Sequence, residues 1–280
     1  MSSRRLIVIG GGNMGGAILR GAIAAGVVWA ERAAVAEPEG GKRAEFAAAG
    51  IAVFEKAAEA AEMVGPGDLM LVAVKPQYFA DVAPAIHEGA SRGGVVVSIM
   101  AGVTVRRLRE AAGDSSRVVR VMPNLPASIG AGMTAIARPQ AGALTAEELG
   151  AVKAVFEAVG RVCEIDEAMM NAFTAVGGSG PAYLFYLAEG MEKGACELGF
   201  SAAEARVIVG QTLLGAARLL GESGTEPGVD RGPGALRESV TSRGGTTAAA
   251  VGVLDENRVL NVICAAIAAA RARGEEIGKV

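Results

Sequence analysis

The stretch of residues 6–16, LIVIGGGNMGG, constrains the fold of this chain more than any other part of its sequence. An apolar run ends at Gly10, and Gly12 and Gly15 complete a G-x-G-x-x-G pattern ahead of a helix predicted over residues 13–26. A strand that turns sharply into a helix offers free backbone N–H groups and the positive end of the helix dipole to an anion. The pattern therefore predicts a Rossmann-type turn that holds the pyrophosphate of a dinucleotide through Gly10, Gly11, Gly12, Asn13, Met14 and Gly15. The alternative, in a chain with 40 glycines, is a strand–helix turn that binds nothing.

Short apolar runs alternate with helical stretches up to about residue 165. Most runs carry Val and Ile at consecutive positions, as expected of strands whose sheet is covered by helices on both faces. This alternation is typical of an α/β fold with a doubly wound, mostly parallel sheet, and it predicts a Rossmann dinucleotide-binding domain over residues 1–166. Strands are predicted over residues 5–9, 34–36, 51–53, 69–73, 95–99, 118–121, 133–137 and 162–165, and helices over residues 40–49, 55–63, 79–90, 104–111 and 146–159.

The strand signal disappears after residue 166, so residues 167–280 are predicted to form an all-helical domain. Its helices are expected over residues 182–198, 202–220, 233–240, 247–254 and 258–273. The last helix is apolar on more than one face, and such a helix is buried on all sides. In a small helical domain this favours subunit association, and we expect an obligate dimer at least, formed through this domain. The residues that wind around that helix are Val259, Leu260, Val262, Ile263 and Ile267.

Composition excludes several classes of function. The net charge of −3 leaves no basic excess to attract nucleic acid. A zinc site is not expected, because the three cysteines lie far apart and His87 is the single histidine. The cysteines indicate a reduced, cytoplasmic protein with buried, inert thiols. Arg4 and Arg5 precede an apolar run at residues 6–9, which is too short for a signal peptide.

The uncharged segment of residues 168–188 is long enough to raise the question of a membrane span. Asn171, Thr174 and the break at residues 177–181 interrupt it, so we predict two buried helices joined by a turn, and no membrane insertion. The break, within GGSGPAY, predicts a tight bend, with Pro181 in the first turn of the next helix.

An acidic residue stands at the end of the second strand, where a Rossmann fold binds the adenosine ribose. Glu37 lies 22 positions after Gly15. Its carboxylate would accept hydrogen bonds from the 2′-hydroxyl and would repel a 2′-phosphate, which favours NADH over NADPH. Lys42 and Arg43 lie close downstream and could instead receive that phosphate. The alternative for Glu37 is a solvated turn residue before Pro38.

Two further strands end in motifs that could face a cofactor. Lys75 follows the fourth strand in AVKP, and it is either a cofactor neighbour or a surface lysine ahead of a proline. Residues 98–102, SIMAG, end the fifth strand with small side chains that would let a nicotinamide ribose come close. Asn124, in MPNLP after the sixth strand, is expected to be structural.

A second glycine turn opens a helix in TSRGGTT, residues 241–247. Free N–H groups of Gly245, Thr246 and Thr247 would form a cradle suited to a carboxylate, with hydroxyl groups beside it. The alternative is an ordinary capped helix start. Since the chain offers few acid–base groups, a cofactor is expected to carry the reaction.

Together these motifs resemble the pyrroline-5-carboxylate reductase family over nearly the whole chain. IGGGNMG, AVKP, SIMAGV, MPN-x-P, GGSGPAY and TSRGGTT follow the family's order and spacing, and the last two are highly specific. The resemblance implies the reduction of L-Δ1-pyrroline-5-carboxylate to L-proline with NADPH or NADH, the last step of proline biosynthesis. It also implies that the helical domain binds substrate and interlocks with a partner's to form a homodimer, with assembly up to decamers and active sites at the dimer interface.

The resemblance also implies roles for individual residues. Val74, Lys75 and Pro76 would flank the cofactor, and Ala101 would approach the nicotinamide ribose. Glu167, Gly245, Thr246 and Thr247 would bind the substrate, with the Thr247 hydroxyl directed at the ring nitrogen as the catalytic group. Ser239 would lie near the cofactor.

The chain departs from the family pattern at several places. Arg243 replaces a proline beside the carboxylate cradle, where it either binds substrate or points to solvent. Glu37 replaces a small polar residue that often accompanies NADPH use. Either Glu226 or Asp230, in a long loop, would be the acid that approaches the site.

Two other functions compete with this one. A β-hydroxyacid dehydrogenase is disfavoured, since no lysine follows GGSGPAY until Lys193. A nucleotide-binding protein without turnover is the competing class.

Overall fold

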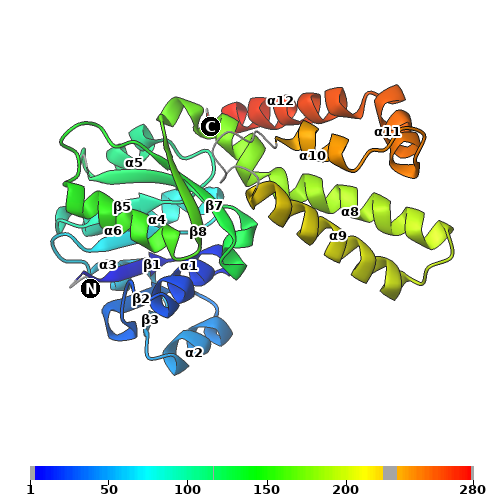
Figure 1. The fold of residues 1–280 in the computed structure, drawn as a ribbon. Helices are drawn as coiled ribbons and strands as arrows, with labels where there is room; N and C mark the ends of the chain where they lie inside the picture. Colours follow the sequence, from blue (N-terminus) through cyan, green and yellow to red (C-terminus); the bar gives the residue numbers. More distant parts are fainter. Residues whose placement is uncertain (1–3, 116, 223–231, 279–280) are drawn as a thin grey trace. The chain divides into compact units, whose positions relative to one another are not determined.

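The computed structural model describes residues 4–115, 117–222 and 232–278. It consists of two units, of which one contains Met1–Pro181 and Ala269–Val280 and the other contains Ala182–Ala268 (Figure 1). The first unit thus takes in the last helical turns of the chain as well as the sheet. The predicted division of the chain at residue 166 stays a prediction.

The first unit is built on an eight-stranded sheet with the order β3-β2-β1-β4-β5-β6-β7-β8. All neighbouring strands are parallel except β6 and β7, which are antiparallel. This confirms the predicted doubly wound, mostly parallel sheet, and all eight strands lie where the apolar runs predict them. The strands are β1 (Leu6–Ile9), β2 (Ala33–Ala36), β3 (Ala52–Phe54), β4 (Leu69–Val72), β5 (Val95–Ser98), β6 (Val118–Met122), β7 (Gly132–Ala137) and β8 (Gly160–Ile165).

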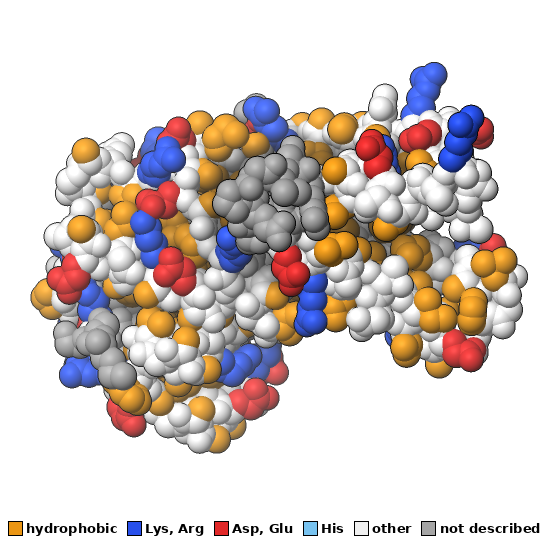
Figure 2. Space-filling model, viewed as in Figure 1, with side chains coloured by type: hydrophobic (Ala, Val, Ile, Leu, Met, Phe, Trp, Pro, Cys, Tyr) orange, Lys and Arg blue, Asp and Glu red, His pale blue; other side chains and the backbone are white. Residues whose placement is uncertain are grey.

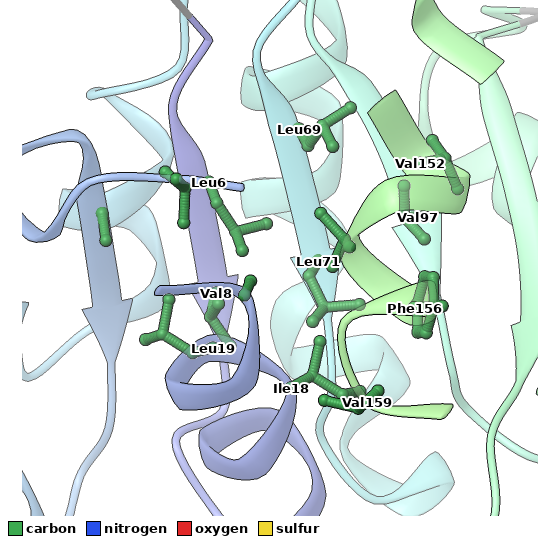
Figure 3. Packing of buried hydrophobic residues seen from close by; sticks show 14 of the residues in the cluster. Leu6, Val8, Ile18, Leu19, Leu69, Leu71, Val97, Val152, Phe156 and Val159 are labelled. Atoms are coloured by element: carbon green, nitrogen blue, oxygen red, sulfur yellow. The ribbon is translucent and has the colours of Figure 1, made fainter. Parts of the chain in front are cut away.

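Helices cover both faces of this sheet, as the consecutive apolar residues of the strands require. Alternate residues of a strand point to opposite faces. Leu6 and Val8 therefore pack against Ile18 and Phe156, which lie on α1 and α6 (Figure 3), whereas Ile7 and Ile9 belong to the cluster on the other face. The helices are α1 (Asn13–Ala24), α2 (Gly40–Ala48), α3 (Ala57–Ala61), α4 (Phe79–Ser91), α5 (Val105–Ala111) and α6 (Ala146–Glu157), with 3₁₀ turns η1 (Ala30–Arg32), η2 (Pro76–Tyr78), η3 (Leu125–Ile129) and η4 (Glu167–Met169).

The tight bend predicted at residues 177–181 is wrong. The chain runs from α7 (Met170–Phe173) through a π-helical turn, η5 (Thr174–Gly178), directly into α8 (Gly180–Glu197). The Ser179 N–H donates to the Thr174 carbonyl at 2.8 Å, which is the five-residue spacing of a π-helix. The Asn124 amide also donates to the Gly177 carbonyl at 2.8 Å, so this wide turn is held by a side chain from the end of β6.

The second unit is all-helical, as predicted. It contains most of α8, α9 (Ala202–Glu222), α10 (Pro233–Ser239), α11 (Thr246–Glu256) and the first part of α12 (Val259–Ile277). The predicted burial of these helices is not reached within one chain: Leu184 and Tyr186 are 55% and 79% exposed. Figure 2 shows hydrophobic side chains on the open surface of this unit.

The prediction of buried thiols is also wrong for the single chain. Cys196 and Cys264 are exposed, and Cys163 is half-buried. Burial raises the pKa of the Cys163 thiol above its ordinary value. Among the described residues, no helix is long and apolar enough to cross a membrane.

Candidate active site

The order of the sheet reverses between β1 and β4, and the glycine turn lies at the carboxyl end of β1. This switch point is where open α/β sheets bind ligands. Gly10 has a φ of +102°, in the region that favours glycine, and its N–H donates to the Ala36 carbonyl at 2.9 Å. A Cβ on Gly10 would lie 2.9 Å from the Ala73 carbonyl oxygen and 3.0 Å from Cγ1 of Val74. The end of β4 therefore packs directly on the turn.

The other glycines of the turn divide into packed and open positions. A Cβ on Gly15 would overlap the Gly10 carbonyl oxygen, and one on Gly11 would lie 2.8 Å from the Phe46 ring. Nothing lies within 4 Å of the corresponding position on Gly12. Close packing thus requires glycine at residues 11 and 15, whereas Gly12 leaves the open approach that a pyrophosphate needs.

The N-terminus of α1 faces this opening without a side-chain cap. Gly12 is the N-cap residue, and no side chain accepts a hydrogen bond from the first turn. The first N–H groups of a helix have no intrahelical partner, so those of Asn13 and Met14 are available to an anion. The arrangement fits the predicted dinucleotide site.

Glu37 is buried beside the turn, so its interpretation as a solvated turn residue is wrong. The residue is 6% exposed, and its carboxylate accepts a hydrogen bond from the Glu39 N–H at 3.0 Å. A Cβ on Gly11 would lie 3.2 Å from Cβ of Glu37. A buried acidic side chain therefore stands at the end of β2.

The two nearby basic side chains, Arg43 and Lys42, already form hydrogen bonds and ion pairs with other groups of the protein. The Arg43 guanidinium donates to the carbonyls of Glu37 and Pro38 at 2.8 and 2.6 Å, and to the Glu55 carboxylate at 3.2 Å. Lys42 pairs with Glu39 at 2.6 Å, and this hydrogen bond raises the pKa of Lys42 above its ordinary value. These contacts compete with a 2′-phosphate for both side chains.

The residues after β4 and β5 lie at the same edge of the sheet as the turn. Lys75 is exposed and precedes η2, in which Pro76 is the first residue. Beyond β5, the Ile99 N–H donates to the Val72 carbonyl at 3.1 Å, and this bond ties the two strand ends together. Ala101 follows on a half-buried loop.

Glu167 lies in a polar network of the first unit. Its Oε1 accepts a hydrogen bond from the Val105 N–H at 2.7 Å, at the start of α5, and lies 3.6 Å from Nη1 of Arg120. Arg120 is 5% exposed, and burial lowers the pKa of its guanidinium while Glu167 acts in the opposite direction. The sequence reasoning missed Arg120, although a charged residue inside the apolar strand VVRVM was a usable signal.

The second glycine turn starts α11 in the helical unit. Gly244 has a φ of +73°, and Gly245 is an N-cap residue without a side-chain cap. The Gly245 N–H donates to the Ser242 carbonyl at 3.0 Å, so it is not free as predicted, and a role of Gly245 in substrate binding stays a prediction. The groups without an intrahelical partner are those of Thr246, Thr247 and the next residue.

The side chains around this turn differ in exposure. Thr246 and Arg243 are exposed, whereas Thr247 is half-buried. Ser239 ends α10, and its hydroxyl donates to the Leu236 carbonyl at 2.7 Å. Glu226 and Asp230 lie outside the described residues.

The structure thus gathers the predicted cofactor residues of the first unit at one sheet edge, and Thr246 and Thr247 at one helix start of the second. Asn124 has the structural role that its motif predicts: its amide reaches the π-turn, and its Oδ1 accepts from the Met133 N–H at 2.9 Å. Ile277, against the loop after β5, was missed, and no pattern in the sequence indicates its contact.

Comparisons with known proteins agree with these two parts. Residues 167–277 match the family model described as pyrroline-5-carboxylate reductase dimerisation, and residues 5–102 match the model described as NADP oxidoreductase coenzyme F420-dependent. The chain is thus an oxidoreductase with a nicotinamide-dinucleotide domain and a dimerisation domain, and the latter supports a homo-oligomer.

Similar proteins cover the full length of the chain. The pyrroline-5-carboxylate reductase of Synechocystis is 38% identical over 99% of both chains, and that of Pasteurella multocida is 34% identical over 100% of both. The structure of a pyrroline-5-carboxylate reductase from Coxiella burnetii superimposes with a TM-score of 0.86 at 30% identity, over 100% of both chains. The fold, the two helix starts and these full-length matches lead to one conclusion: the chain belongs to the pyrroline-5-carboxylate reductase family.

Proposed function

We propose that this protein reduces L-Δ1-pyrroline-5-carboxylate to L-proline with a nicotinamide cofactor, as the last step of proline biosynthesis in the cytoplasm. The observation that carries the proposal is the start of α11. It is an uncapped helix N-terminus with a half-buried threonine in its first turn, within the motif most specific to the family. The residues around Gly12 supply the matching place for the cofactor.

The chemistry needs few protein groups. A cyclic imine must receive a hydride at carbon and a proton, which solvent supplies, at nitrogen, while its carboxylate is held in place. The nicotinamide supplies the hydride when it is bound. The N–H groups of Thr246 and Thr247 hold the carboxylate, and the Thr247 hydroxyl donates a hydrogen bond to the ring nitrogen. Arg243 adds a positive charge near the carboxylate, and Glu167 lies on the substrate side.

Positioning then supplies most of the rate. Holding two reactants in the correct geometry removes an entropic cost that a reaction in solution must meet. Val74, Lys75, Pro76 and Ala101 flank the nicotinamide half of the cofactor, and Ser239 lies near it. Glu37 binds the adenosine ribose, so NADH is the preferred reductant. The protein acts as a homodimer, and dimers assemble further, up to decamers.

Initial rates test this function directly. NADH and NADPH oxidation are measured with pyrroline-5-carboxylate and with its six-membered homologue, in wild type, Thr247→Ala and Thr247→Ser. Thr247→Ala is expected to lower kcat/KM about a hundredfold, as for a lost hydrogen-bond donor at a reacting atom, with NADH affinity unchanged. Thr247→Ser keeps the hydroxyl and is expected to retain most of the rate.

Each part of the proposal has its own contrary result. An unchanged rate in Thr247→Ala removes Thr247 from the mechanism. NADH binding without oxidation in the presence of either imine makes the protein a nucleotide-binding module. A monomeric mass at micromolar concentration in light scattering overturns the dimer.

A further inference from the structure

The C-terminal end of α12 packs on the loop that follows β5. A Cβ on Gly102 would lie 2.5 Å from Cγ2 of Ile277 and 3.4 Å from its Cβ. The corresponding position on Gly278 is 3.6 Å from the Gly102 carbonyl oxygen. The helix end and the loop are therefore in direct contact, although 175 positions separate Gly102 from Ile277 in the sequence.

The loop after β5 has buried residues at both ends, Met100 and Val103, and a less buried tip at Ala101 and Gly102. Met100 and Val103 are each 1% exposed, and the Met100 N–H donates to the Ser98 hydroxyl at 3.2 Å. Ala101 and Gly102, between these anchors, are half-buried. Gly102 has a φ of +77°, which disfavours any side chain there. The Ile277 side chain occupies the space that such a side chain would need.

A second set of contacts ties the same helix end to the start of α5. A Cβ on Gly274 would lie 3.6 Å from Cγ of Asn171, and Oδ1 of Asn171 accepts a hydrogen bond from Arg120 at 3.4 Å. Arg120 in turn pairs with Glu167, which accepts from the Val105 N–H. The last turns of α12 thus contact the loop after β5 at Gly102 and pass close to Asn171, the first member of the polar network that reaches Val105.

We propose that Ile277 is a positioning residue for the reaction and that it acts through the tip at Ala101 and Gly102. This inference rests on the proposed function, which sets the nicotinamide ribose against Ala101. Because the loop keeps its buried anchors without Ile277, a loss of this side chain should loosen the tip and leave the fold intact. Displacing a reacting group by about 1 Å costs up to about a hundredfold in rate.

The test compares Ile277→Ala with Ile277→Val, which keeps the Cγ2 methyl group that lies against Gly102. Arg273→Ala is the matched control on the same helix end, since Arg273 is 70% exposed and pairs with Glu276 at the surface. Ile277→Ala is expected to lower kcat about tenfold and to raise the isotope effect with 4-deuterated NADH. The Kd of ADP-ribose, which lacks the nicotinamide, should stay within about twofold, and the other two variants should resemble wild type.

Two results would overturn the role of Ile277. One is an unchanged kcat and isotope effect in Ile277→Ala. The other is an equal loss of affinity for NADH and ADP-ribose, which would mark a general structural defect. If wild type itself fails to reduce either imine, the proposed function fails. The ratio of the NADH Kd to the ADP-ribose Kd then tests the role of Ile277 separately, because only NADH contains the nicotinamide. If this ratio is the same in Ile277→Ala and in wild type, the positioning role is overturned.

Discussion

The two units of this protein differ in how much of their hydrophobic core one chain provides. The sheet-containing unit buries its large side chains completely, with Phe46, Ile86 and Phe156 at 2% exposure or less. In the helical unit, Ala205 and Val209 are the only buried hydrophobic residues within the described part of Ala182–Ala268. The sheet-containing unit thus has a complete hydrophobic core within one chain. The helical unit instead leaves an apolar surface that a second copy of the chain can cover.

This difference has a thermodynamic consequence. Burying one large apolar side chain contributes about 1.5–3 kcal/mol, and the helical unit gains little of that within one chain. Its exposed side chains include Phe185, Tyr186, Leu260 and Val262. The stability of the helical unit should therefore rise with protein concentration, while that of the sheet unit should not.

The largest effect is expected from a charge placed on the apolar surface of α12, because this surface is expected to be buried in the dimer. Leu260, which is 61% exposed in the single chain, is replaced by Asp. Burying an unpaired carboxylate costs about 3 kcal/mol or more, so the dimer should dissociate and imine reduction should be lost. Mass by light scattering and initial rates measure the two effects.

Its control is the same substitution on the other unit. Ile129 is 81% exposed on η3, and Ile129→Asp is expected to leave the dimer intact. A dimeric Leu260→Asp variant would show that this face of α12 stays in solvent.

A pair of glycine substitutions sharpens the contrast on the side of the sheet unit. Gly15→Ala drives a methyl group into the Gly10 carbonyl and should cost about 2 kcal/mol of unfolding free energy, independent of protein concentration. Gly12→Ala meets open space and should fold normally, yet weaken NADH binding about tenfold by filling the approach to the pyrophosphate. Thermal unfolding and NADH titration separate the two, and equal NADH affinity in Gly12→Ala and wild type would exclude this approach.

A smaller effect is expected from replacing Glu37. The substitution should change the preference between NADH and NADPH and leave the dimer intact. Glu37→Ser removes the negative charge beside the adenosine ribose. The ratio of kcat/KM for NADPH to that for NADH should rise about tenfold or more, because a like-charge contact is relieved. Rates with both cofactors measure this ratio, and a constant ratio would assign selectivity elsewhere.

The smallest effect concerns a cap within the helical unit. The Glu204 carboxylate accepts hydrogen bonds from the Ser201 hydroxyl and N–H at 2.6 and 2.9 Å, and these bonds, the hydroxyl bond first, lower the pKa of Glu204 below its ordinary value. This stabilisation is present above the ordinary pKa and disappears as pH falls through the lower, folded one. Ser201→Ala should therefore lower Tm slightly at about pH 7, and the difference should shrink in acid. A difference in Tm that grows on acidification would contradict this sign.

The sheet and the glycine turn could be predicted because their signals are local. Runs such as LIVI and VVVS define strands by themselves, and Gly10 and Gly15 stand where the turn needs them. The π-turn at residues 174–178 could not be predicted, since the hydrogen bond that its Gly177 carbonyl accepts comes from Asn124, a residue far away in the sequence. The N–H of Gly245 was misjudged for a related reason, because a turn bond to Ser242 competes with any ligand.

The return of α12 to the sheet unit also bears on how the protein is made. The chain emerges from the ribosome with its N-terminus first, and domains generally fold as they emerge. The sheet can form once residue 181 is free, but the unit to which it belongs lacks residues 269–280 until the whole helical unit has been translated. During synthesis the sheet must therefore form before Ile277 is available to contact the loop at Gly102, and that contact is added last.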